Sequence, residues 1–229
     1  MAQNPQMLAD NHSKILAKIQ SHLKAGDTRN PELIAVSKTQ PDSAVRAVFA
    51  LGQRRFGENY AQELSDKAEA LKDLAIHWIY IGHLQSNKLK KIVTHAAEIQ
   101  TVASFDHAKS IARHAADLGK TPYPIYLEIN AGDEASKSGL NKDEILPLAA
   151  KIEAELPELT LKGLMAIPPD TYTDEAFASV PPLYKELRAL ADQVGEGKLS
   201  LGMSNDLRLA LEAGSDFVRV GTAIFGRRS

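Results

Sequence analysis

The chain has 229 residues, of which 44% are hydrophobic and 24% are charged, so it can bury one sizeable core and is neither disordered nor fibrous. Its 27 Lys and Arg residues against 29 Asp and Glu residues give a formal charge of -2, which excludes a global basic field for binding nucleic acid or an anionic membrane surface. Cysteine is absent, which excludes disulfides, thiolate zinc sites and cysteine nucleophiles and agrees with a reducing compartment.

The chain begins with a polar sequence that lacks the apolar core of a signal peptide, and no apolar run approaches the roughly 18 residues of a membrane span. We therefore expect a cytoplasmic protein without a membrane segment. An amphipathic helix is expected within residues 7–25, ahead of the first strand.

Short apolar, β-branched segments then alternate with helical patterns along the chain, which is typical of β-α units in a parallel sheet. The predicted strands are 33–36, 55–57, 77–81, 98–102, 124–129, 160–165, 199–201 and 217–220. The predicted helices between them are 43–51, 61–71, 87–95, 106–118, 142–156, 174–194 and 207–213. Ser43, Asn87, Asp106 and Asp174 are predicted to cap four of these helices.

Eight strands that alternate with helices predict an α/β fold, a single closed (β/α)8 TIM barrel with an extra N-terminal helix, rather than an open doubly wound sheet. The turn after the first strand, 37–41, is not glycine-rich, and no dinucleotide-binding or P-loop motif occurs. No linker or low-complexity tract is present, so residues 1–229 are expected to form one domain. The Pro-containing stretch 167–173 is expected to be a loop on the functional rim.

In such a barrel the functional site forms at the C-terminal ends of the strands, and we expect the residues there to converge on one mouth. These residues are Lys38, Glu58, Asn59, His83, Met165, the segment 202–205, Arg219, Gly221 and Thr222.

Lys38 follows a strand apolar enough to be buried on both faces. A partly desolvated amine at that point has a lowered pKa and attacks carbonyl groups. The alternative is that Lys38 marks the place where the chain emerges into solvent.

The segments after the last two strands contain the parts of a phosphate site. Ser204 and Asn205 precede a helix, and Gly221 and Thr222 follow the last strand, so hydroxyl, amide and backbone donors are available. An ordinary helix cap and an ordinary strand-to-helix turn are the alternatives.

Arg219 lies within an apolar strand, where a guanidinium needs a partner. A structural ion pair with a glutamate of a neighbouring strand and a ligand contact are both open. A carbonyl-reactive lysine, a phosphate site and a strand-borne arginine fit pyridoxal phosphate (PLP) through its aldehyde, phosphate and ring nitrogen. They also fit a Schiff-base aldolase acting on a phosphosugar, and spacing does not decide between the two.

Seven ordered segments resemble the pyridoxal phosphate homeostasis protein family over nearly the whole chain. They are 35–38, 56–59, 81–88, 136–139, 163–165, 202–206 and 219–226. The resemblance implies a fold-type III PLP-binding barrel related to the N-terminal domain of alanine racemase. It also implies that the cofactor is held as an internal aldimine on Lys38.

By the same resemblance, Ser204, Gly221 and Thr222 contact the phosphate and Arg219 contacts the ring nitrogen. Asn59, His83 and Met165 match positions that line the cofactor pocket, and Asn205 adjoins the phosphate contacts. No metal site is expected, because His77 and His83 would lie about 20 Å apart along a strand. Lys137 and the basic run 88–91 are expected to be solvated surface.

The function implied is a non-catalytic, monomeric PLP carrier or buffer that makes transient contacts with apo forms of PLP enzymes. Racemisation needs an acid and a base on opposite faces, and the chain ends soon after Gly226, so no second domain is expected to supply one of them. An arginine at the ring nitrogen does not protonate it, which weakens the electron sink. A PLP-dependent racemase is the alternative.

Overall fold

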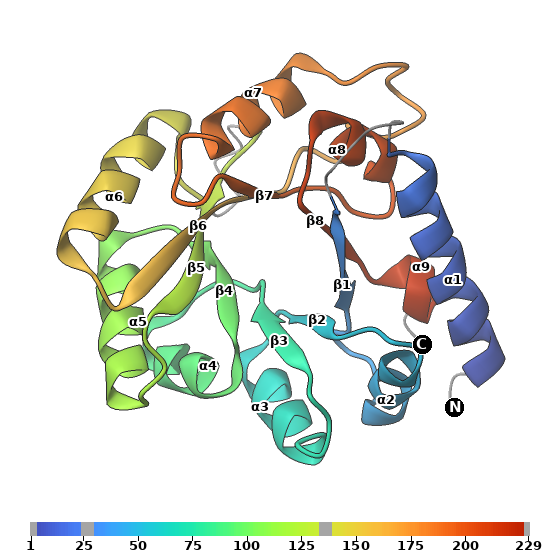
Figure 1. The fold of residues 1–229 in the computed structure, drawn as a ribbon, viewed down its shortest axis with the longest axis horizontal. Coiled ribbons are helices and arrows are strands. Elements are labelled where there is room, and N and C mark those ends of the chain that lie inside the picture. Colours follow the sequence, from blue (N-terminus) through green and yellow to red (C-terminus); the bar gives the residue numbers. More distant parts are fainter. Residues whose placement is uncertain (1–3, 24–29, 133–138, 227–229) are drawn as a thin grey trace.

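The structure is a computed structural model that describes residues 4–23, 30–132 and 139–226, and Figure 1 shows its fold. In these ranges eight parallel strands pair in chain order and close into a barrel, because the last strand pairs with the first. The strands are β1 (Glu32–Val36), β2 (Arg55–Glu58), β3 (His77–Tyr80), β4 (Glu98–Val102), β5 (Tyr123–Ile129), β6 (Leu159–Ala166), β7 (Lys198–Ser200) and β8 (Phe217–Val220). The predicted barrel is confirmed, and each predicted strand overlaps one of these.

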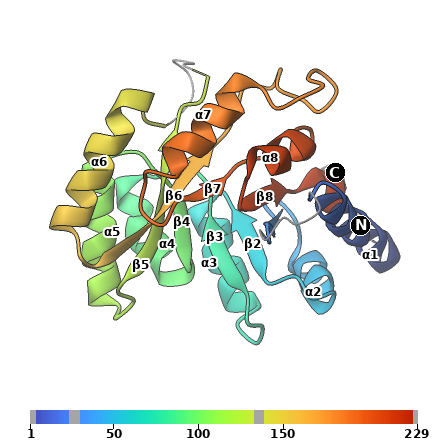
Figure 2. The same cartoon turned by 45° about the horizontal axis from the view of Figure 1, so that its top comes forward.

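Helices surround the barrel, as the tilted view in Figure 2 shows. They are α1 (Pro5–Ser21), α2 (Asp42–Ala50), α3 (Ala61–Ala70), the 3-10 turn η1 (Ser86–Lys88) with α4 (Leu89–His95), α5 (Phe105–Asp117), α6 (Lys142–Glu155), α7 (Pro182–Ala191), α8 (Leu207–Ala213) and α9 (Thr222–Phe225). None of the helices in the described ranges is long and apolar enough to cross a bilayer.

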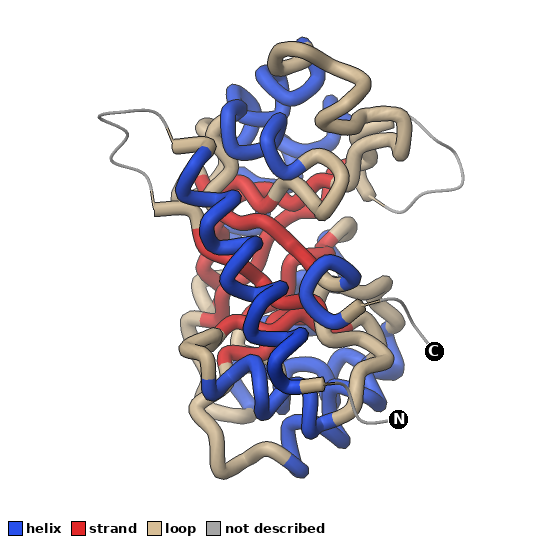
Figure 3. Tube along the Cα trace, turned by 90° about the vertical axis from the view of Figure 1, so that its right-hand side faces the viewer, coloured by secondary structure: helices blue, strands red, loops and turns tan. Residues whose placement is uncertain are grey.

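The predicted extra helix is α1, which packs outside the barrel against α2, α8 and α9 (Figure 3). Its residues Leu8, His12, Ile15 and Ile19 share one buried face, as the helical period requires. Asn11 Nδ2 donates to the carbonyl of Ile224 at 3.1 Å. This contact ties α1 to α9, the short helix that follows β8, the strand that carries Arg219.

The predicted helix 174–194 is wrong over its first part. The chain from 174 to 181 is irregular, and α7 begins only at Pro182 with Pro181 as its N-cap. Proline favours the first helical turn and disfavours helical geometry in the residue before it, so the pair of prolines sets this start. Short α9 was not predicted.

The predicted helix caps are also wrong. Ser43 and Asp106 lie inside their helices, and Asn87 lies within η1. The cap of α5 is Ser104, whose hydroxyl accepts a hydrogen bond from the backbone N–H of His107. Asp174 caps a different helix, α8, as described below.

A small apolar cluster, separate from the main core, fills part of the barrel interior: Ile34, Ile79, Tyr126, Met165 and Phe217. The rings of Tyr126 and Phe217 meet edge to face with centroids 6.1 Å apart. Because the interior is packed there, space for a ligand remains at the C-terminal ends of the strands.

Candidate functional site

A cavity of about 200 Å³ opens at the C-terminal ends of the strands. Its lining residues are Val36, Lys38, Asn59, Ile81, Met165, Ile167, Met203, Ser204, Arg219, Gly221 and Thr222. Seven of the nine residues predicted for a cofactor site therefore meet in one place. A larger depression of about 430 Å³ lies at the opposite end of β8, beside Asp216, away from these residues.

Two predicted site residues lie outside this cavity. His83 is exposed, and its carbonyl accepts a hydrogen bond from the Tyr80 hydroxyl at 3.1 Å. The strand ends at Tyr80, and Gly82 packs so tightly on the Asn59 backbone that a Cβ would lie 1.9 Å from its carbonyl oxygen. Strand alternation, on which the expectation for His83 depended, thus stops before residue 83.

Asn205 is the second of these residues. It is exposed and lines a small neighbouring pocket with Pro168, Pro169 and Tyr172. Its carbonyl accepts a hydrogen bond from the backbone N–H of Asp174 at 2.7 Å. Asn205 therefore holds the loop after β6 rather than lining the main cavity.

Lys38 directly follows Ser37, which contacts the buried charged side chains of Glu58 and Lys67. Ser37 is buried, its carbonyl accepts from Lys67 Nζ at 2.5 Å, and its hydroxyl donates to Glu58 Oε1 at 2.6 Å. Burial raises the pKa of the Glu58 carboxyl and outweighs the opposing attraction of Lys67. The turn that carries Lys38 is thus anchored to β2 and α3.

Arg219 is buried in β8 and points across the barrel. Its Nη1 donates to the carbonyl and hydroxyl oxygens of Ser200 at 2.7 and 2.8 Å, and its Nη2 donates to the Ala166 carbonyl at 2.7 Å. No carboxylate of the described chain lies within 4.0 Å, so the structural ion pair considered from the sequence is not the arrangement found. Burial lowers the pKa of Arg219 to about 10, which leaves it charged at neutral pH.

A chain of hydrogen bonds continues from Arg219 through the barrel interior. The Ser200 hydroxyl donates to Gln100 Oε1 at 2.8 Å, and Gln100 Nε2 donates to Glu98 Oε1 at 2.7 Å. Because the Ser200 proton is committed to Gln100, the Ser200 oxygen is available to accept from Arg219. This chain fixes the orientation of the guanidinium.

Glu128, near the C-terminal end of β5, is a buried carboxyl that the sequence analysis did not single out. Burial raises its pKa to about 7, although the positive charge of Arg219 acts in the opposite direction. A charged residue in the otherwise apolar predicted strand 124–129 was the signal that could have found it.

The other side of the cavity is formed by Ser204 and by Gly221 and Thr222 at the start of α9. A Cβ on Gly221 would lie 3.0 Å from the Val36 carbonyl oxygen and 3.3 Å from Val36 Cβ, so a larger residue would require β1 to shift by a few tenths of an ångström. The two hydroxyls and the close backbone form a polar wall suited to an anion.

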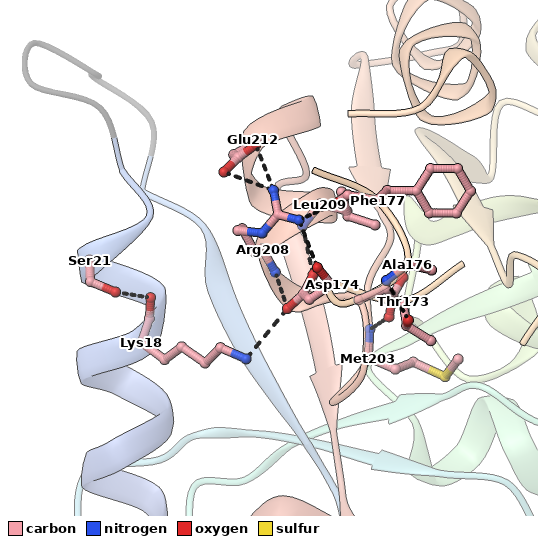
Figure 4. Close-up of polar contacts among 11 residues, drawn as sticks. Lys18, Ser21, Thr173, Asp174, Ala176, Phe177, Met203, Arg208, Leu209 and Glu212 are labelled. Carbon is pink, nitrogen blue, oxygen red and sulfur yellow. Dashed lines mark hydrogen bonds and ion pairs between the residues drawn. The ribbon is translucent and has the colours of Figure 1, made fainter. Parts of the chain in front are cut away.

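The N-terminal N–H groups of α8, by contrast, are already hydrogen-bonded to a carboxylate of the protein. Asp174 accepts hydrogen bonds from the backbone N–H groups of Arg208 and Leu209, both at 3.1 Å (Figure 4). Asp206 accepts a hydrogen bond from the Met203 N–H at 2.7 Å. The backbone N–H groups of Met203, Arg208 and Leu209 are therefore already bound within the protein.

The same contacts fasten the loop after β6 beside the cavity. Asp174 also lies 3.4 Å from Lys18 Nζ of α1, and Arg208 Nη2 donates to its carbonyl at 2.9 Å (Figure 4). The sequence did not indicate these contacts because they join three segments that are far apart in the chain: α1, the loop after β6 and α8.

The chemistry of the cavity lining matches the functional groups of PLP. The lining has an amine, two hydroxyls and a buried cation with neutral partners, which match an aldehyde, a phosphate and a ring nitrogen. Asn59 Oδ1 is buried and has no hydrogen-bond partner within the described chain, as expected of a group that meets a ligand. The residues present fit the cofactor. Among the described residues no cluster could hold a metal ion.

The chain matches the family model of the alanine racemase N-terminal domain over residues 10–229 and belongs to that class of barrel proteins. It is 41% identical to the pyridoxal phosphate homeostasis protein of Pseudomonas aeruginosa, covering 96% of both chains. It is 40% identical to that of Escherichia coli (strain K12), covering 93% of this chain and 95% of the relative. The chain therefore belongs to the pyridoxal phosphate homeostasis protein family, and the resemblance seen in the sequence is confirmed.

Solved structures agree with this assignment. PipY of Synechococcus elongatus with PLP bound is 33% identical, with a TM-score of 0.78, and the match covers 96% of this chain and 100% of that one. Alanine racemase from Corynebacterium glutamicum is 17% identical, with a TM-score of 0.68, and the match covers 96% of this chain and 60% of that one. The second likeness shows the barrel fold alone.

Proposed function

We propose that this protein binds PLP in the cavity at the barrel mouth and serves vitamin B6 homeostasis by holding the cofactor for buffering or delivery. The observation that carries the proposal is the meeting of Lys38, Ser204, Arg219 and Thr222 around about 200 Å³ of space. The printed description of PipY, a relative with PLP bound, supports the same ligand.

Lys38 is the proposed covalent attachment point. When bound, PLP supplies an aldehyde that condenses with amines. Lys38 would supply the amine for this covalent link, with the aldehyde oxygen lost as one water molecule. Ser204, Thr222 and the backbone at Gly221 would hold the phosphate through hydrogen bonds to its oxygens. Asn59 and Met165 would line the space for the ring, and no cofactor contact is proposed for the exposed His83 and Asn205.

Arg219 is the proposed contact of the ring nitrogen, and it supports a role in holding rather than transforming substrates. With a pKa of about 10 it keeps its proton at neutral pH, so it donates a hydrogen bond and leaves the ring nitrogen unprotonated. Lys38 and Arg219 are the titratable side chains among the described residues that line the cavity. Racemisation needs an acid and a base on opposite faces, so this lining favours a carrier over a racemase.

The proposed setting is the cytoplasm, in agreement with the absence of cysteine. The proposed working form is a monomer. Transient contact with apo forms of PLP enzymes would complete delivery.

A binding experiment tests the phosphate side. Ser204→Ala combined with Thr222→Val should weaken PLP binding by about 1.5–3 kcal/mol per hydrogen bond lost, and barely change the binding of unphosphorylated pyridoxal. The paired control is Ser86→Ala with Thr94→Val, an exposed and a partly exposed site that do not line the cavity. Equal losses for PLP and pyridoxal would contradict the phosphate assignment.

The racemase alternative is tested by α-proton exchange. Wild-type protein loaded with PLP should exchange the α-proton of amino acids with deuterated solvent negligibly. Exchange and racemisation at an ordinary enzymatic turnover of about 1–10³ per second would overturn the carrier role.

A further inference from the structure

Lys67 of α3 lies behind the turn that carries Lys38, and its surroundings are unusual for a lysine. It is only 4% exposed. Its Nζ contacts three acceptors: Glu58 Oε1 at 2.8 Å, Glu63 Oε1 at 2.7 Å and the Ser37 carbonyl at 2.5 Å. We call Glu58, Glu63 and Lys67 the anchor cluster.

The anchor cluster holds the backbone on both sides of Lys38. Before Lys38, Ser37 is bound at its carbonyl by Lys67 and at its hydroxyl by Glu58. After Lys38, the backbone N–H of Thr39 donates to Glu63 Oε1 at 2.6 Å. Lys67 therefore joins Glu58 to Glu63, and together the three side chains contact both sequence neighbours of Lys38.

The turn needs such support because its backbone is strained. Thr39 has a φ of 63°, in the left-handed region that β-branched residues rarely adopt. A residue held there is strained and persists only when its surroundings impose that conformation. The Glu63 contact on the Thr39 N–H is one such constraint.

A purely stabilising role explains the anchor cluster less well. Replacing a buried ion pair by well-packed apolar residues is often neutral or stabilising, so burial of these charges is weak evidence that they serve stability alone. Their outward contacts converge on Ser37 and Thr39. Figure 1 shows α2, α3 and the end of β1 on the same side of the barrel.

We propose that Glu58, Glu63 and Lys67 are positioning residues, which fix the turn 37–39 so that the Lys38 amine enters the cavity in the orientation needed for covalent attachment to PLP. This proposal depends on the function proposed above. The anchor cluster does not touch the reacting atoms. It takes no part in the condensation itself, which still releases one water molecule.

Glu63→Ala is the decisive variant because Glu63 is partly exposed on α3 and its loss leaves the buried pair of Lys67 and Glu58 in place. Its control is Glu69→Ala, an exposed glutamate on the same helix. Two quantities are measured. One is the rate of borohydride-trapped attachment of PLP to Lys38. The other is the affinity for pyridoxine 5′-phosphate, which has the ring and phosphate but no aldehyde.

We expect Glu63→Ala to slow attachment by about 10- to 100-fold, the cost of misplacing a reacting group. Affinity for pyridoxine 5′-phosphate should stay within about twofold, since the phosphate and ring contacts are untouched. Glu63→Gln keeps an oxygen that accepts from the Thr39 N–H and should recover much of the rate, and Glu69→Ala should match wild type.

Two results would overturn the proposal: attachment by Glu63→Ala at the wild-type rate, or a parallel fall in attachment and in pyridoxine 5′-phosphate affinity. Failure of the wild-type protein to attach PLP to Lys38 at all would instead overturn the proposed function, so the two failures are distinguishable.

Discussion

Two buried cations of the described chain, Lys67 and Arg219, are each 4% exposed but are stabilised in different ways. Lys67 contacts two carboxylates and a carbonyl within 2.8 Å. Arg219 contacts neutral oxygens of Ser200 and Ala166, while Asp206 and Glu128 act on it at longer range. The charge of Lys67 is thus matched by adjacent opposite charge, and that of Arg219 is not.

The difference separates a cation that holds a neighbouring turn of the protein from one placed for a ligand. Adjacent carboxylates compensate Lys67 within the protein, so an anionic ligand gains little from it. Arg219 lines the cavity and is oriented by Ser200, Gln100 and Glu98 without a carboxylate in contact. Burial alone therefore does not identify a binding residue, whereas the nature of its partners does.

The largest expected effect compares the loss of each cation. Lys67→Met leaves the carboxylates of Glu58 and Glu63 without their cation and should lower the free energy of unfolding by about 3–5 kcal/mol. Arg219→Met leaves only neutral acceptors and should cost about 1–3 kcal/mol. Urea denaturation of the cofactor-free proteins measures both. An equal or larger loss for Arg219→Met would contradict the comparison.

A smaller effect concerns the charge facing Arg219. Glu128 has a pKa of about 7 in the folded protein against 4.5 for an unperturbed glutamate, so its stabilising contribution is present below pH 4.5 and is lost as the pH rises through 7. The difference corresponds to about 3 kcal/mol. Relative to wild type, Glu128→Gln should become more stable by about this amount between pH 4 and pH 8.

Denaturation at several pH values measures this difference, with Glu153→Gln on the exposed face of α6 as the control. If the difference in free energy of unfolding between Glu128→Gln and wild type does not change with pH, the pKa of Glu128 is not raised in the folded protein. Arg219 would then have a full negative charge nearby, and the contrast with Lys67 would weaken.

The sequence predicted the barrel and most of the cavity because both depend on local patterns. Apolar runs located the strands, and the residue that ends each strand is set by the same pattern. Lys38 and Arg219 stood out as charges beside or within such runs. His83 was misplaced because the strand ended three residues earlier, where Gly82 packs on the Asn59 backbone.

The partners of the site could not be predicted in the same way. Lys67 and Glu63 read as ordinary charges on an amphipathic helix, and only the closed barrel brings them against Ser37 and Thr39. Asp174 read as a cap for the following helix but caps α8, which starts more than thirty residues later. Such contacts depend on tertiary packing between distant segments, for which one sequence has no local signal.

Chemical trapping tests the central claim most directly. The purified protein is loaded with PLP, reduced with borohydride, digested and mapped by mass spectrometry. The account predicts one pyridoxyl group per chain, on the peptide that contains Lys38, and none on that peptide in Lys38→Arg. A label found mainly on another lysine, such as Lys137, would contradict the assignment of Lys38.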